Sequence, residues 1–197
     1  MRYHFHPGAA DAPALLVLHG TGGGPDDLLG LARHLNPASP VLAPAGPVSE
    51  NGMARWFRRL AEGVFDFEDV RRRAGELADF VRATREEHAL TGRLVAVGFS
   101  NGANIAGALA LLHPDVVSEA ALFAGMNPLP EVPETDLSAS RVFLCNGTAD
   151  AMAPIDSAGA LAAALRSRGA AVTAFRHAGG HHIPAEAADA AADWLNA

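Results

Sequence analysis

The hydrophobic positions of this chain fall into short β-branched runs that alternate with longer segments of helical spacing. In the clearest helical segment, residues 67–88, Val70, Ala74, Leu77 and Val81 recur at intervals of four, three and four residues. This alternation predicts an α/β fold with a mostly parallel, doubly wound sheet and helices on both faces. The predicted strands are 14–20, 40–46, 93–99, 116–123, 141–147 and 171–177, and the predicted helices are 25–35, 67–88, 100–113, 155–168 and 184 onward.

Composition narrows the class of protein. A chain of 197 residues with 49% hydrophobic residues suits one domain spanning 1–197. The formal charge of -7 disfavours nucleic acid and anionic membrane surfaces as partners. No apolar run approaches the roughly 18 residues of a membrane span, and the N-terminus lacks the apolar core of a signal peptide. We therefore expect a soluble, cytoplasmic monomer or homodimer whose single cysteine, Cys145, is a buried strand thiol.

A candidate nucleophile, Ser100, lies between a predicted strand and a predicted helix in the sequence GFSNG. The G-x-S-x-G pattern at a strand-to-helix turn is typical of a serine nucleophile whose hydroxyl projects from the end of a sheet. Gly98 and Gly102 remove side chains that would collide with neighbouring backbone in such a strained turn. The alternative is an ordinary turn in which the serine only caps the helix.

A serine nucleophile needs a base and an acid that orients the base, each on a loop after a later strand. Asp150 follows the predicted strand 141–147, and His181 and His182 follow the last predicted strand. Both loops fall at the carboxyl edge of a parallel sheet, where such folds place their sites. The alternatives are a capping carboxylate and either a solvated turn or a metal-binding histidine pair. Because no cysteine or H-E-x-x-H spacing accompanies the histidines, we expect no metal.

An oxyanion hole would complete the site with two backbone N–H groups. The residue after the nucleophile, Asn101, supplies one candidate, and Thr21, in the glycine-rich turn after the first core strand, supplies the other. The same glycines could form a phosphate-binding loop. That interpretation fits poorly, because Pro25 stands where G-x-G-x-x-G requires glycine and no G-K-[ST] follows.

Several strings along nearly the whole chain resemble one family of enzymes. They are LHGTGG, ENGMARWFRRLAEGVFDFEDV, VGFSNGANIA, NGTADAMAPI and GGHHIPAEAADAAADWL. They look like the small bacterial α/β-hydrolases of the carboxylesterase and phospholipase group, and within it the branch of MhqD-like and YahD-like serine esterases. The resemblance implies an α/β-hydrolase fold without a separate cap domain, and a site with Ser100 as nucleophile, Asp150 as acid and an oxyanion hole from Thr21 and Asn101. The family pattern G-H-x-[IL] matches residues 180–183, which implies that His181 is the base.

Residues 45–67 combine a high aromatic content with no long periodic element. Long irregular segments of compact domains are usually functional or disordered, and this segment is too apolar to be disordered. We therefore expect Met53, Trp56 and Phe57 to form one wall of the substrate pocket. The alternative, that each aromatic residue only pins the loop to the core, stays open.

Three arginines in the same segment have two possible roles. They could recognise a substrate carboxylate, or they could form a solvated face paired with nearby acids, and the sequence favours the second interpretation. The arginines are Arg55, Arg58 and Arg59, and the acids are Glu62, Asp66 and Glu68.

Together these features predict a serine esterase that cleaves a small carboxylic ester without a cofactor. A thioesterase or lysophospholipase could use the same residues, and a hydrolase-like protein could bind a ligand without turnover. With no room for a separate cap domain, we expect an open pocket for short-chain substrates.

Overall fold

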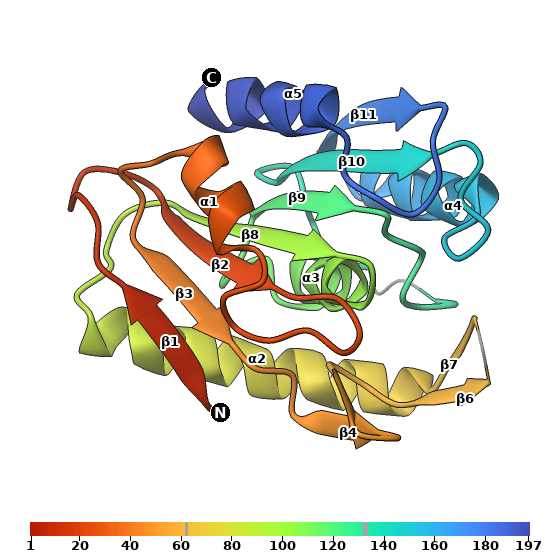
Figure 1. Cartoon of the computed structure of the whole chain (residues 1–197), viewed down its shortest axis with the longest axis horizontal. Coiled ribbons are helices and arrows are strands. Elements are labelled where there is room, and N and C mark those ends of the chain that lie inside the picture. The colour runs from red at the N-terminus through yellow and green to blue at the C-terminus, as the bar shows by residue number, and fades with distance from the viewer. Residues whose placement is uncertain (62, 132–133) are drawn as a thin grey trace.

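The computed structural model describes residues 1–61, 63–131 and 134–197 of the chain. Its main sheet has seven strands in these described residues (Figure 1). All neighbours pair in parallel except the first strand, which runs antiparallel at one edge. In spatial order the strands are β1 (Tyr3–His6), β3 (Val41–Pro44), β2 (Ala14–Leu18), β8 (Leu94–Phe99), β9 (Glu119–Phe123), β10 (Arg141–Gly147) and β11 (Ala171–His177).

Helices cover both faces of this sheet, as the alternating pattern predicts. One apolar cluster joins α1 and α5 to one face, and a second joins α2, α3 and α4 to the other. This arrangement confirms the predicted α/β-hydrolase fold with a mostly parallel, doubly wound sheet. The helices are α1 (Leu29–Leu35), α2 (Phe67–Glu87), α3 (Asn101–Leu112), α4 (Ile155–Ser167) and α5 (Ala185–Asn196). None of the helices in the described residues is long and apolar enough to cross a membrane.

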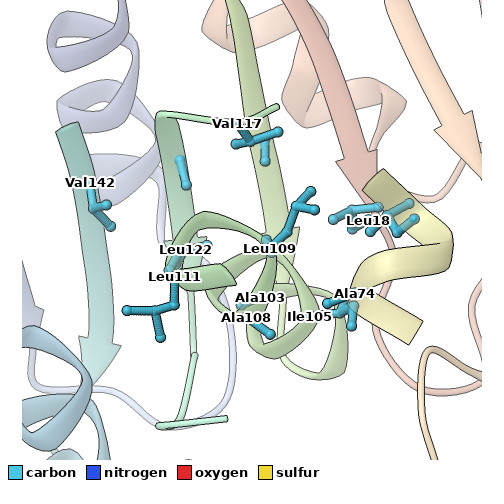
Figure 2. Packing of buried hydrophobic residues seen from close by; sticks show 14 of the residues in the cluster. Leu18, Ala74, Ala103, Ile105, Ala108, Leu109, Leu111, Val117, Leu122 and Val142 are labelled. Atoms are coloured by element: carbon cyan, nitrogen blue, oxygen red, sulfur yellow. The ribbon is translucent and has the colours of Figure 1, made fainter. Parts of the chain in front are cut away.

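Helix α3 is the best-buried helix and sits directly under the sheet. Every residue from Asn101 to Leu111 is buried, and Figure 2 shows its side chains packed between strand residues such as Leu18 and Leu122 and Ala74 of α2. The alanines and glycines of α3 let its backbone approach the backbone of strand β2 closely. At Gly102 a Cβ would overlap the main-chain carbonyl of Leu18, so only glycine fits there.

Three local features differ from the predicted elements. Strand β1 was not predicted, because a four-residue edge strand carries too little pattern to stand out. Helix α1 begins at Leu29 instead of residue 25, because residues 25–28 form turns and Asp26 accepts hydrogen bonds from His4 and His6 of β1. Strand β9 begins at residue 119, three residues later than predicted.

The aromatic segment 45–67 is more regular than its sequence predicts. It contains two antiparallel hairpins, which lie below and to the right of the main sheet in Figure 1. The first hairpin is β4 (Val48–Glu50) with β5 (Met53–Arg55), and the second is β6 (Arg59–Ala61) with β7 (Val64–Phe65). Strands of two or three residues are too short for a period-2 pattern to reveal.

Candidate active site

Four predicted site residues meet at one edge of the main sheet. Ser100 follows β8, Asp150 follows β10, His181 follows β11 and Thr21 follows β2. Because these strands are parallel, their carboxyl ends lie at the same edge. Residues separated by more than 150 positions in the chain therefore reach one site.

Ser100 occupies a strained turn between β8 and α3. Its φ and ψ are 54° and -119°, a conformation that non-glycine residues rarely adopt. The flanking glycines make the turn possible, since a Cβ at Gly98 would lie 2.5 Å from the carbonyl oxygen of Gly102. The Ser100 N–H donates to the carbonyl of Phe123 at 2.9 Å, which ties the turn to the neighbouring strand.

His181 lies between Ser100 and Asp150. Its Nε2 is 2.9 Å from the hydroxyl oxygen of Ser100, and its Nδ1 is 2.7 Å from Oδ2 of Asp150. An ionised carboxylate can only accept, so Nδ1 donates to Asp150 and Nε2 remains free to accept the Ser100 proton. His182 makes a different contact, edge-on to the ring of His177. The structure thus brings His181, and not His182, to the serine.

Asp150 is 5% exposed and is held by two further donors. Its Oδ1 accepts hydrogen bonds from the N–H groups of Met152 at 2.8 Å and Ala153 at 2.9 Å. Burial raises the pKa of this carboxyl, but the hydrogen bonds from Ala153, His181 and Met152 together outweigh burial, so the pKa lies below its usual value. Asp150 is therefore ionised at neutral pH.

The two predicted oxyanion donors lie at the ends of separate elements. Asn101 is the first residue of α3, where an N–H has no carbonyl one turn earlier to bind. Thr21 lies in the turn after β2, which is closed by a Gly23 N–H to Gly20 carbonyl bond and pinned by a bond from the Gly22 N–H to the carbonyl of Ala54. Across residues 1–61, 63–131 and 134–197, no backbone carbonyl accepts the Thr21 N–H. Both amides are available to an oxygen of a ligand.

Two buried residues, His19 and Trp56, support this turn, and the sequence analysis did not single out His19. His19 donates from Nδ1 to the carbonyl of Gly20 and accepts the Gly46 N–H at Nε2. Burial lowers the pKa of His19 more than the Gly20 carbonyl and Asp27 raise it, so the ring is neutral. The indole N–H of Trp56 donates to the His19 carbonyl at 2.8 Å. The only sequence signal for His19 is its position beside the glycine-rich turn.

A cavity of about 660 Å³ opens over the serine. Met53 lines it, as predicted, but Trp56 and Phe57 do not, since they are 1% and 0% exposed in the core beneath. Trp56 and Phe57 instead fix the hairpins to the core, which is the alternative role considered for the aromatic residues of this segment. The lining residues are Thr21, Met53, Arg55, Arg59, Gly63, Phe65, Ser100, Asn101, Asn104, Ala124, Met126, Ala151, Met152, Ala153, Pro154 and His181.

The three arginines of the segment take different positions. Arg58 is solvated and pairs with Asp66, as expected, and it also lies near Asp69. Arg55 is 4% exposed and lines the cavity, so the predicted solvated face is wrong for this residue. Arg59 also lines the cavity. None of the described ion pairs involves Glu68, and Glu62 lies outside the described residues.

One cluster of potential metal ligands occurs away from the cavity in the described part of the chain. His4 and His6 of β1 each contact a carboxylate oxygen of Asp26, at 2.8 and 2.9 Å. The cluster is largely exposed, and in the structure these contacts link the edge strand to the turn before α1.

Comparisons with known proteins indicate the family and the fold of the chain. The phospholipase/carboxylesterase family model matches residues 5–197. The chain is 39% identical to the putative hydrolase MhqD of Bacillus subtilis (strain 168), with 98% of this chain and 97% of that protein covered. A Bacillus cereus carboxylesterase structure superposes with a TM-score of 0.96 at 36% identity, covering 100% of this chain and 93% of that chain. The structure of YahD with malic acid gives a TM-score of 0.93 at 30% identity, covering 99% and 98%.

Proposed function

We propose that this chain, which belongs to the phospholipase/carboxylesterase family, is a serine esterase that cleaves carboxylic esters through an acyl-enzyme. The observation that carries the proposal is the continuous hydrogen-bonded series from Ser100 through His181 to Asp150. Both contacts in this series have hydrogen-bond lengths, and with the ring proton on Nδ1 of His181 they have the donor directions that nucleophilic catalysis by serine requires.

In the first half of the reaction, Ser100 attacks the ester carbonyl while Nε2 of His181 takes the hydroxyl proton. The imidazolium that forms keeps its Nδ1–H on Asp150, whose ionised carboxylate stabilises the positive charge. His181 then gives the proton to the departing alcohol oxygen, the bond from the carbonyl carbon to that oxygen breaks, and the acyl group remains on Ser100.

In the second half, a water molecule enters where the alcohol left. His181 takes a proton from the water, the resulting hydroxide adds to the acyl carbonyl, and the bond to Ser100 breaks as Nε2 returns the proton to the serine oxygen. The products are a carboxylic acid and free enzyme. In both halves the amides of Thr21 and Asn101 hydrogen-bond the carbonyl oxygen as it gains negative charge.

A fluorophosphonate probe tests the nucleophile directly. The folded protein is expected to gain one adduct, located on Ser100 by peptide mass spectrometry, and the Ser100→Ala variant is expected to gain none. An unlabelled Ser100 in folded protein, together with no hydrolysis of short p-nitrophenyl esters, would contradict the proposal and favour a ligand-binding protein of the same fold.

The two adjacent histidines provide a matched pair of variants for the base. His181→Ala is expected to lower kcat/KM for p-nitrophenyl acetate by at least about 10³-fold, because no base remains beside Ser100. His182→Ala removes only the packing against His177 and is expected to retain most activity. The reverse pattern would show that His182 is the base.

A further inference from the structure

Among the described residues, the lining of the cavity over Ser100 contains two arginines and no acid. Three of its described lining residues have ionisable side chains, namely Arg55, Arg59 and His181, and none of the described lining residues is acidic. Both arginines share one counter-ion outside the lining: Glu50 Oε1 is 2.7 Å from Nε of Arg59, and Oε2 is 3.3 Å from Nε of Arg55. Two guanidinium groups therefore face one carboxylate.

The side chain of Arg55 makes its polar contacts with other residues of the protein. Its Nη1 donates to the hydroxyl of Thr21 at 2.8 Å, and its Nε lies near the carbonyl of Phe57 as well as Glu50. Burial and the charge of Arg59 lower the pKa of Arg55, and Glu50 opposes them. These contacts make Arg55 a positioning residue that fixes the oxyanion turn.

Within the described residues, the Arg59 guanidinium has N–H groups without a hydrogen-bond partner. Its Nε is bonded to Glu50, and the described residues offer no hydrogen-bond partner to its terminal Nη1 and Nη2 groups. Its side chain is 28% exposed. The two terminal nitrogens of a guanidinium form a planar fork that matches the two oxygens of a carboxylate. The Arg59 guanidinium is partly desolvated at the wall of the cavity, and it shares its counter-ion Glu50 with Arg55. It is therefore suited to bind an anionic group of a ligand.

The rest of the wall is suited to a hydrocarbon chain. Side chains of Met53, Phe65, Met126 and Met152 line the same cavity, and methionine adapts its shape to apolar ligands of varied geometry. The cavity thus combines a nucleophile, an apolar wall and a cationic fork in one space of about 660 Å³. A ligand that satisfies all three has an ester, a short aliphatic spacer and an anionic end.

We propose that the substrate is an ester that carries a free carboxylate on a short hydrocarbon chain, with the carboxylate bound by Arg59. This inference rests on the proposed esterase activity and specifies its substrate class. The carboxylate can belong to the acyl part, as in a half ester of an aliphatic dicarboxylic acid, or to the alcohol part, as in an acylated hydroxy acid.

Matched pairs of esters test the inference. The acyl arm compares monomethyl esters of four- to six-carbon dicarboxylic acids with their neutral carboxamide analogues, and the alcohol arm compares 3-acetoxypropanoate with 3-acetoxypropanamide. Hydrolysis is followed by acid release. In at least one arm the carboxylate ester is expected to have a kcat/KM about 10- to 100-fold above its amide, the range for a charged hydrogen bond. The preference should shrink as ionic strength rises.

Two arginine variants assign the effect to a residue. Arg59→Gln is expected to remove the preference by lowering kcat/KM for the carboxylate ester about 10- to 100-fold, while the amide changes less than about threefold. Arg58→Gln is the control, because Arg58 belongs to the same segment but pairs with Asp66 away from the cavity. It is expected to leave both rates unchanged.

The outcomes separate this inference from the function on which it rests. Neutral esters hydrolysed as well as charged ones in every pair would overturn the carboxylate preference and leave the esterase intact. Equal losses on both substrates in Arg59→Gln would show a structural role for Arg59 and would also overturn it. No hydrolysis of any ester and no labelling of Ser100 by the fluorophosphonate would instead overturn the proposed function.

Discussion

Replacing Asp150 by asparagine is expected to change the tautomer of His181 without changing the shape of the site. Oδ1 of Asp150 accepts two backbone N–H groups, from Met152 and Ala153, and Oδ2 accepts the His181 Nδ1–H. In Asp150→Asn only the carboxamide oxygen can accept from the two backbone amides. The opposite orientation would place the NH₂ group against two donors and lose both bonds.

The carboxamide NH₂ must then point at Nδ1 of His181. Since this NH₂ can only donate, Nδ1 becomes an acceptor and the ring proton moves to Nε2, the nitrogen 2.9 Å from the Ser100 hydroxyl. A protonated Nε2 cannot take the serine proton. A histidine held in the wrong tautomer costs a Ser-His-Asp site about 10⁴-fold in rate, which corresponds to about 5.5 kcal/mol of transition-state free energy.

The assay is kcat/KM for p-nitrophenyl acetate, together with the rate of fluorophosphonate labelling, because both depend on the same proton transfer. Both are expected to fall about 10⁴-fold in Asp150→Asn. Asp156→Asn, an exposed acid in the first turn of α4, serves as the matched control and should behave as wild type. A loss below about 100-fold in a folded Asp150→Asn variant would refute the tautomer reasoning.

Three further predictions concern stability and reactivity. Gly102→Ala forces a Cβ into the carbonyl of Leu18 and should cost about 3 kcal/mol or more in urea unfolding; an unchanged midpoint would contradict the packing. Burial raises the pKa of the Cys145 thiol to about 12, so a disulfide reagent at pH 8 should modify it only in denaturant. Burial raises the pKa of Glu119, but its arginine partners Arg93 and Arg141 outweigh burial, so the pKa lies below its usual value. Glu119→Gln should lose about 1 to 3 kcal/mol of stability at pH 7. This difference should shrink as pH falls below the ordinary pKa of a glutamate and should be lost once pH passes below the lowered pKa of the folded state.

The sequence predicts the elements whose hydrophobic residues recur with a helical or strand period, and the site residues that directly follow a predicted strand. The buried strands, the long helix α2 and the position of Ser100 between β8 and α3 all follow from local pattern. Asp150 can be predicted to lie near Ser100 because parallel strands bring their carboxyl ends to one edge. The choice of His181 over His182 came only from the family resemblance, because adjacent residues share the same spacing.

The contacts of the 45–67 segment could not be predicted in the same way. Aromatic content indicates that Trp56 and Phe57 are buried, but it does not say whether a ligand or the core buries them. The arginines differ among themselves for a similar reason. Arg55 is buried because its partners, Glu50 and Thr21, come from a hairpin and a turn that only tertiary structure brings together.

The position of β11 at an edge of the sheet affects which part of the molecule unfolds first. This strand has a neighbour on one side only, most of its residues are at least partly exposed, and the loop after it carries His181. Ser100 and Asp150, in contrast, follow strands with neighbours on both sides. Local opening at an edge requires less free energy than global unfolding. Mild denaturant should therefore abolish activity while the central strands stay intact, so activity would report the integrity of this edge of the sheet.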